Sequence, residues 1–186
     1  SFAGVDADGQ ELEGNHFVRC SFRGAVLDGI RTANCTFDAC DFSNAQLNGS
    51  AHEGSDFANS IFENVNLFGA TFEECRLLGV DFTAAVLTGI TITRGDLSYG
   101  LLRGHDLARL DLQGIKAHEA DFSESSLVEA DLRNADLSRA VMQNANLAGA
   151  DLREANLDGV NLSVALVEGA RLDLAGAVQL ARSLGV

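Results

Sequence analysis

Large apolar side chains return at every fifth position along almost the whole chain. Between Phe2 and Leu172 this frame contains 35 positions, and 28 of them are Leu or Phe. Two residues before each lies a second regular position that favours small side chains, while the other three positions are mostly polar. A period of five fits neither an α-helix nor a single alternating strand. It predicts a chain that turns a corner every five residues, with one large and one small side chain pointing inward on each side.

A second period, of 20 residues, indicates that four such sides close one coil. Phe recurs at this spacing in two of the four columns, one of which begins at Phe2, and a third column is almost entirely Leu. Adjacent coils would pair as short parallel strands about 4.8 Å apart and bury their apolar residues against each other. The absence of proline suits this pairing, because nearly every amide donates to the next coil. We therefore expect an all-β, parallel β-helix over residues 1–172, in the form of a rod about 40 Å long.

The segment 173–186 leaves this frame and is typical of a short C-terminal α-helix. Asp173 is a suitable N-cap, Arg182 falls in the last turn and Gly185 is a suitable C-cap. A solenoid has to cover the open end of its core, so we expect this helix to cap it. Its apolar arc is wider than a cap needs, which favours a two-fold homodimer joined end to end. The residues assigned to the dimer interface are Leu174, Ala177, Val178, Leu180, Ala181 and Leu184.

The chain is strongly acidic, with 27 Asp and Glu against 13 Lys and Arg and a net charge of −14. This charge disfavours direct binding to nucleic acid or to an anionic membrane, because contacts with phosphate need Lys or Arg. No apolar run is long enough to span a membrane and no secretory signal is visible, so we expect a cytoplasmic protein.

The sequence offers no pattern that is typical of catalysis or metal binding. All four cysteines occupy the small inward position, where packing explains them. The four histidines are scattered, and no spacing of Cys or His resembles a zinc site. The glycines follow the corners at the repeat spacing and do not form a phosphate-binding loop. We therefore expect a protein that is not an enzyme and that holds no cofactor and no metal.

Outward aspartates recur at intervals of one coil. Asp111, Asp131 and Asp151 occupy equivalent positions in successive coils and should form a ladder of negative charge. One interpretation is a solvated face that keeps the rod soluble. The other is a rod of regularly spaced charge that imitates duplex DNA, for which Asp121 and Asp136 are the two further candidate contact residues.

An exposed apolar patch supports a different hypothesis for the function. Phe68, Val86, Val128 and Leu166 point outward on one predicted side of the coils. Patches of this kind bind other proteins. A structural or adaptor solenoid could therefore bind an unknown protein partner here, and its acidity would then serve solubility alone.

Three repeats carry a family resemblance: Ala-Asp-Leu-Arg-Asn at 130–134, Ala-Asn-Leu-Ala-Gly at 145–149 and Ala-Asn-Leu-Asp-Gly at 155–159. They resemble the pentapeptide repeat family, and the resemblance over residues 2–172 implies a right-handed quadrilateral β-helix. The C-terminal segment resembles the terminal helix of the topoisomerase-protecting branch of that family. The stretch around 104–133 looks most like the mycobacterial, MfpA-type fluoroquinolone-resistance proteins and less like the Qnr proteins, whose two projecting loops have no place in this unbroken frame.

The resemblance also implies a function. Proteins of this branch are similar to B-form DNA in size, shape and charge, bind DNA gyrase in place of DNA, and protect it from quinolones or peptide poisons. Two rods joined tail to tail would reach about 80 Å, comparable to about 24 base pairs. By resemblance we expect a non-enzymatic DNA mimic that binds DNA gyrase through the five aspartates named above and confers resistance to gyrase poisons.

Overall fold

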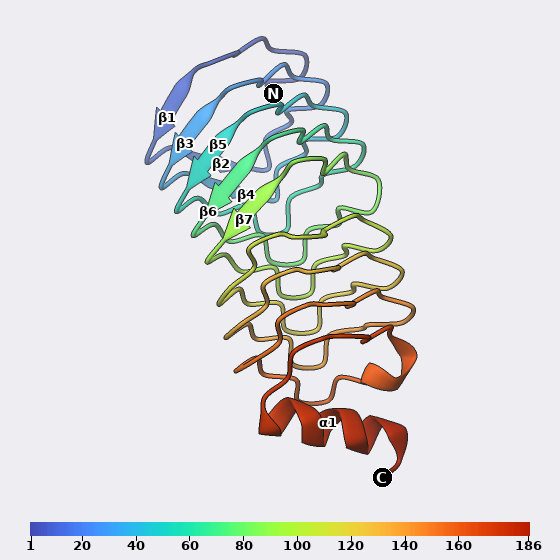
Figure 1. The fold of residues 1–186 in the computed structure, drawn as a ribbon. Coiled ribbons are helices and arrows are strands. Elements are labelled where there is room, and N and C mark those ends of the chain that lie inside the picture. The colour runs from blue at the N-terminus through green and yellow to red at the C-terminus, as the bar shows by residue number, and fades with distance from the viewer. The chain divides into compact units, whose positions relative to one another are not determined.

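The computed structural model describes residues 1–186 and divides into two compact units, Ser1–Asp96 and Leu97–Val186. Within each unit the chain winds in coils of 20 residues that hydrogen-bond to one another (Figure 1). The amide of Leu27, for example, donates to the carbonyl of Gln46 at 2.7 Å, and the amide of Gln46 donates back to the carbonyl of Ala25 at 2.9 Å. This exchange is the parallel pairing of neighbouring coils, and it confirms the predicted β-helix with its 20-residue period.

Extended strands form on two sides of the coils in the first unit. Five parallel strands make one sheet in the order β1-β3-β5-β6-β7, and each strand is paired in a register of 20 residues with the next. Their bounds are β1 Glu11–Glu13, β3 Arg31–Ala33, β5 Ala51–Glu53, β6 Thr71–Glu73 and β7 Thr91–Thr93. The adjoining side holds a two-stranded sheet of β2 His16–Val18 and β4 Thr36–Asp38. In the second unit the coils pair through isolated bridges instead of strands.

The corners explain the recurrence of glycine and asparagine. We call the large inward residue at every fifth position the central residue. The second residue after almost every central residue has a positive φ, as in Gly49 at +61° and Asn44 at +61°. Glycine has no steric penalty in this left-handed region, and asparagine tolerates it better than most residues. The amide of Ala45 closes such a corner on the carbonyl of Phe42 at 2.9 Å. A positive φ at the third residue of a four-residue turn is typical of type II geometry.

The core of each unit is filled by the central apolar residues. In the first unit phenylalanines of successive coils lie face to face, with ring centroids 4.9 Å apart for Phe22 and Phe42 and 4.8 Å for Phe37 and Phe57. Small residues such as Ala25 are fully buried beside them. The predicted Phe columns are therefore real, and their spacing equals the distance between paired strands.

The second unit ends in the 3-10 helix Leu162–Val164 and the α-helix α1, Leu174–Leu184. The side chain of Asp173 accepts the amide of Gly176 at 2.9 Å, and Gly185 closes the helix in the left-handed conformation. Asp173 and Gly185 are thus the N-cap and C-cap residues of α1, as predicted. With 11 residues, α1 is too short to cross a membrane, and no other helix of the structure is longer.

One side of α1 is tied to the last coil by polar groups. The side-chain amide of Gln179 donates to the carbonyl of Val160 at 2.8 Å, and the Ser183 hydroxyl accepts the amide of Leu162 at 3.2 Å. Gly176 is buried, and a Cβ atom there would lie 2.9 Å from the side chain of Leu172. Glycine at this position therefore lets the helix approach the end of the coil closely.

Candidate functional site

The aspartates that precede the central residues support their own corners. In all five candidate residues the carboxylate accepts a hydrogen bond from the backbone N–H two residues later, at 2.8 Å for Asp121 and up to 3.3 Å for Asp151. Asn146 makes the same bond at 3.0 Å. Such local bonds from Asp and Asn to the backbone are characteristic of turns. Part of the recurrence of Asp at this position is therefore structural, which the spacing alone did not reveal.

The structure brings three of the five candidate aspartates together. Asp111 is paired in register with Asp131, and Asp131 with Asp151, so these three form the expected ladder on one side of the second unit. Asp121 and Asp136 are paired with other residues on two other sides of the coil. A single flat partner could not contact all five at once.

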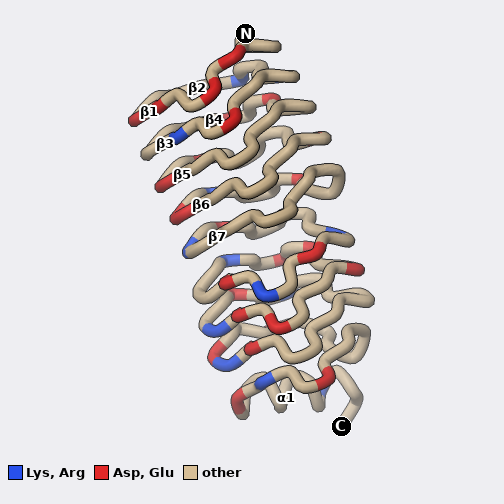
Figure 2. Tube along the Cα trace, turned by 45° about the horizontal axis from the view of Figure 1, so that its top comes forward, with Lys and Arg blue, Asp and Glu red and all other residues tan.

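Arginines next to the ladder offset much of its charge. The guanidinium of Arg133 lies 2.5 Å from the carboxylate of Asp131, and that of Arg153 lies 2.6 Å from Asp151. These arginines lower the pKa of Asp131 and, to about 2, the pKa of Asp151. Figure 2 accordingly shows basic and acidic positions interleaved in the coils next to α1. Two of the three carboxylates of the ladder, those of Asp131 and Asp151, therefore carry a neighbouring cation.

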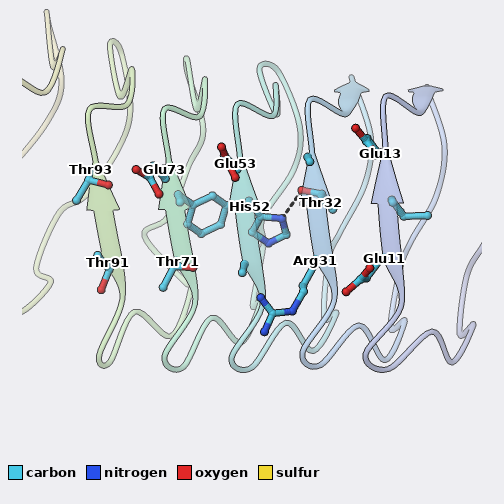
Figure 3. A pocket seen from close by; sticks show the side chains of 14 residues that line it. Glu11, Glu13, Arg31, Thr32, His52, Glu53, Thr71, Glu73, Thr91 and Thr93 are labelled. Atoms are coloured by element: carbon cyan, nitrogen blue, oxygen red, sulfur yellow. Dashed lines mark hydrogen bonds between the residues drawn. The ribbon is translucent and has the colours of Figure 1, made fainter.

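A second acidic surface, which was not among the predicted sites, lies on the first unit. The outer face of the sheet β1-β3-β5-β6-β7 is hollowed into a groove of about 750 Å³. Figure 3 shows Glu13, Glu53 and Glu73 along one edge of this groove and Glu11 on the other. We call it the sheet groove. The signal in the sequence was present, since Glu11 and Glu13 flank the central Leu12 and Glu53 and Glu73 each follow a central residue, whereas most of the aspartates precede one.

Negative charge is greater on the first unit than on the second. Residues 1–96 carry 14 acidic and 5 basic side chains, a net charge of −9, and residues 97–186 carry 13 and 8, a net charge of −5. All five candidate aspartates lie in the second, less acidic unit. The position of the charges therefore matters more than the count in each unit.

The outward side of α1 is apolar and uncovered. Leu174 is 82% exposed and Leu184 is 61% exposed, and Val178 and Ala177 are exposed as well. The remaining two candidate interface residues, Leu180 and Ala181, are half-buried. With its polar Gln179 and Ser183 turned toward the last coil, the helix presents its apolar side to solvent, which is the reverse of an ordinary surface helix.

The repeats of this chain match a known protein family. The profile described as Pentapeptide repeats matches the chain in eight copies, over residues 16–51, 53–89, 106–144, 120–163 and 135–175. These segments include most of the coils. The chain belongs to the pentapeptide repeat family.

Solved structures of QnrB1 match this pentapeptide repeat protein over nearly its whole length. A full-length structure of QnrB1, a plasmid-mediated fluoroquinolone resistance protein, is 25% identical and superposes with a TM-score of 0.85 over 98% of this chain and 96% of that one. A trypsin-treated variant of QnrB1 is 26% identical, with a TM-score of 0.86 and coverages of 99% and 95%. No curated protein sequence matches the chain. These structural relatives are of the Qnr type, and the resemblance to the mycobacterial type stays a prediction.

The other candidate residues of this pentapeptide repeat protein are distributed over both units. Phe68 and Val86 are exposed in the first unit, whereas in the second unit Leu166 is exposed and Val128 is half-buried. No group of three or more His, Cys, Asp or Glu side chains is arranged to hold a metal ion. All four cysteines are free thiols, and three of them are buried.

Proposed function

We propose that this protein binds DNA gyrase in place of DNA and so protects the enzyme from fluoroquinolones or other gyrase poisons. The observation that carries the proposal is the match to QnrB1, which extends over 98–99% of this chain and 93–96% of the QnrB1 chains at 25–26% identity. The superposition therefore leaves no large segment of this chain or of QnrB1 unmatched. QnrB1 is a plasmid-mediated fluoroquinolone resistance protein.

The action we propose is occupancy of a protein surface and not catalysis. Both units are net negative, so they repel nucleic acid and attract a protein surface that has evolved to hold DNA phosphates. The ladder of Asp111, Asp131 and Asp151 repeats once per coil, so the spacing of its charges is about 4.8 Å. We assign gyrase contacts to this ladder, and also to Asp136 on an adjoining side and Asp121 on the opposite side, which a partner can reach only by surrounding the coil. Such a partner also implies a cytoplasmic location and requires neither a cofactor nor a membrane.

We further propose that two copies join through α1. Its exposed residues Leu174, Ala177, Val178 and Leu184 form an apolar side that a second α1 would cover in an isologous contact. The helix is held from behind by Gln179 and Ser183, so it can present this side without leaving the last coil. In this arrangement 173–186 both caps the coils and forms the dimer.

A supercoiling and cleavage assay with purified gyrase tests the proposed function. Gyrase is assayed with relaxed plasmid and ciprofloxacin, with and without this protein. Protection predicts fewer drug-induced double-strand breaks at protein concentrations that do not affect ligation by an unrelated DNA enzyme. If micromolar protein changes neither cleavage, supercoiling nor ATP turnover by gyrase, the proposed function is wrong.

A variant in which the ladder aspartates are replaced by Asn tests whether gyrase binding depends on their charge. Replacing Asp111, Asp131 and Asp151 with Asn retains the oxygen that accepts each backbone N–H, so the coils stay folded while three charges are lost. The matched control is the triple Asn variant of Asp41, Asp56 and Asp81, which make the same backbone bonds in the first unit. Weaker gyrase protection in the ladder variant than in the control supports the assignment of the ladder.

A further inference from the structure

The sheet groove on the first unit is the part of the surface that the proposed function does not use. Its floor is formed by the five strands β1, β3, β5, β6 and β7, and its volume is about 750 Å³. Four carboxylates and one guanidinium, that of Arg31, line it. His52 lies beneath the floor and is neutral at pH 7, because burial lowers its pKa to about 3. The groove is therefore net negative.

Three of the four carboxylates of the sheet groove make no contact within the chain, and the fourth, that of Glu73, pairs with Arg94. Glu11, Glu13 and Glu53 are exposed, and their side-chain carboxylates accept no hydrogen bond and form no ion pair in the structure. The aspartates at the corners, by contrast, accept the backbone N–H two residues later, as Asp81 does at 2.8 Å. Repulsion among unpaired carboxylates destabilises the chain unless a partner offsets it. The turns thus explain the aspartates, but they do not explain these glutamates.

The geometry of the groove indicates where a cation fits. Ala33 is the register partner of both Glu13 and Glu53, on the strands before and after it. The two glutamates are therefore two strand spacings apart, about 9.6 Å, with only a methyl group between them. An ammonium or guanidinium group placed over Ala33 would lie about 4.8 Å from each glutamate position. No group of three or more His, Cys, Asp or Glu side chains is arranged here to hold a metal ion.

We propose that the sheet groove binds an extended, lysine- or arginine-bearing segment of a protein partner, with one cationic side chain over Ala33 between Glu13 and Glu53. The five strands span about 19 Å, which is the length of about six extended residues. The floor consists of small or hydroxyl side chains, Ala33, Ala51, Thr71 and Thr91, so a backbone can approach it closely. This proposal concerns the first unit and does not depend on gyrase being the partner.

A synthetic peptide tests the chemistry directly. The probe is an acetylated peptide of alternating Lys and Gly, about eight residues long so that it spans the strands. Its binding to the full-length protein is measured by calorimetry and by backbone amide shifts, at about 0.15 M salt, where long-range attraction is largely screened. We expect saturable binding with shifts concentrated in β1, β3, β5 and β6.

Two variants should remove this binding without unfolding the chain. Glu13→Gln with Glu53→Gln removes the pair of charges, and Ala33→Arg supplies the cation from the protein itself. The matched controls are Glu63→Gln with Glu168→Gln, which are exposed and unpaired elsewhere, and Ala148→Arg, at a half-buried position equivalent within its repeat. We expect the dissociation constant to rise about tenfold in the first two variants and less than about twofold in the controls. Circular dichroism checks that all four remain folded.

Three results would overturn the proposal. The first is the absence of saturable binding to the unaltered protein. The second is equal weakening by the groove variants and their controls, which would mean attraction by total charge alone. The third is spermidine binding at the groove as tightly as the peptide, because the site would then select a small polyamine and not a protein segment.

Discussion

The Oγ1 atom of Thr32 and the Nδ1 atom of His52 lie 2.8 Å apart in the core of the first unit. Both residues occupy the central position that is elsewhere mostly Leu, Phe or Ile, and they are one coil apart in the same column. The other ring nitrogen of His52 lies 3.0 Å from the Ser50 hydroxyl, and the Thr32 hydroxyl lies 3.0 Å from that of Ser55. The two polar exceptions to the repeat therefore satisfy each other, and no buried side-chain nitrogen or oxygen is left without a partner.

This pair predicts a loss of stability in acid. Burial lowers the pKa of His52 to about 3, whereas the unfolded residue titrates near 6.5. Above pH 6.5 the ring is neutral in both states. Between pH 6.5 and 3 only the unfolded chain takes up this proton, so the free energy of unfolding falls as the pH falls, by about 1.4 kcal/mol per pH unit.

Urea unfolding at about pH 6.5 and about pH 4.5 measures this contribution. Carboxylates titrate in the same range, so the protein is compared with His52→Phe, whose ring suits a site between Phe57 and Phe72. We expect the unaltered protein to lose about 2–3 kcal/mol more than the variant over this interval. Equal losses would show that His52 does not titrate with folding.

The corner aspartates predict different effects for Asn and Ala. Asp121 accepts the amide of Ser123 at 2.8 Å, and Asn would offer the same oxygen. Asp121→Asn should change the free energy of unfolding by less than about 0.5 kcal/mol, whereas Asp121→Ala should lower it by about 1 kcal/mol. Urea denaturation measures both. If the two variants are equally stable, the corner bond does not contribute and the recurrence of Asp needs another cause.

The period of five and its 20-residue multiple were enough to predict the coils, the Phe columns and the caps of α1, because one buried column imposes the same demand on every coil. They were not enough to predict which sides become strands. The strands lie where the turn bond between the central residue and the third residue after it is missing, as at Phe37 and Cys40. Each cysteine thiol lies 3.4–3.6 Å from the carbonyl two residues earlier, at the end of a strand. Cys at the inward position was interpreted as packing alone, and its bond to the strand end was missed.

The candidate site was less predictable than the fold. Spacing predicted the ladder of Asp111, Asp131 and Asp151, but it could not show that Arg133 and Arg153 turn back onto Asp131 and Asp151. Spacing also did not distinguish aspartates whose carboxylates accept a backbone N–H at a corner from glutamates whose carboxylates accept none. That distinction depends on one methylene, since the Asp carboxylate is close enough to its own backbone to accept the N–H two residues later.

Backbone conformation predicts opposite effects for two substitutions at the corners. Ala39 is an exposed residue at a φ of +50°, so Ala39→Gly should raise the free energy of unfolding by about 0.5–1 kcal/mol. Gly49 has a φ of +61°, and a methyl group added there would meet no atom within 4 Å, so Gly49→Ala should lower it by about 1 kcal/mol through the backbone alone. Thermal unfolding followed by circular dichroism measures both. Ala108→Gly, one position earlier in its repeat and at a residue without positive φ, is the control and should destabilise.

The exposed apolar side of α1 predicts that one charged substitution there should dissociate the proposed dimer. Val178 lies on the exposed apolar side, so Val178→Glu would bury a carboxylate in a helix–helix contact, and we expect a monomer in sedimentation velocity. Leu180 is a poorer choice, because it is half-buried and its replacement would also disturb the packing of the helix. Val141→Glu is the matched control, since Val141 is comparably exposed in the same unit but lies on a side of the coil. It should leave the dimer intact, and both variants should retain the circular dichroism of the β-helix. If the unaltered protein is a monomer, there is no dimer and the proposal is wrong. If the unaltered protein and Val178→Glu both sediment as dimers, the dimer contact lies away from α1.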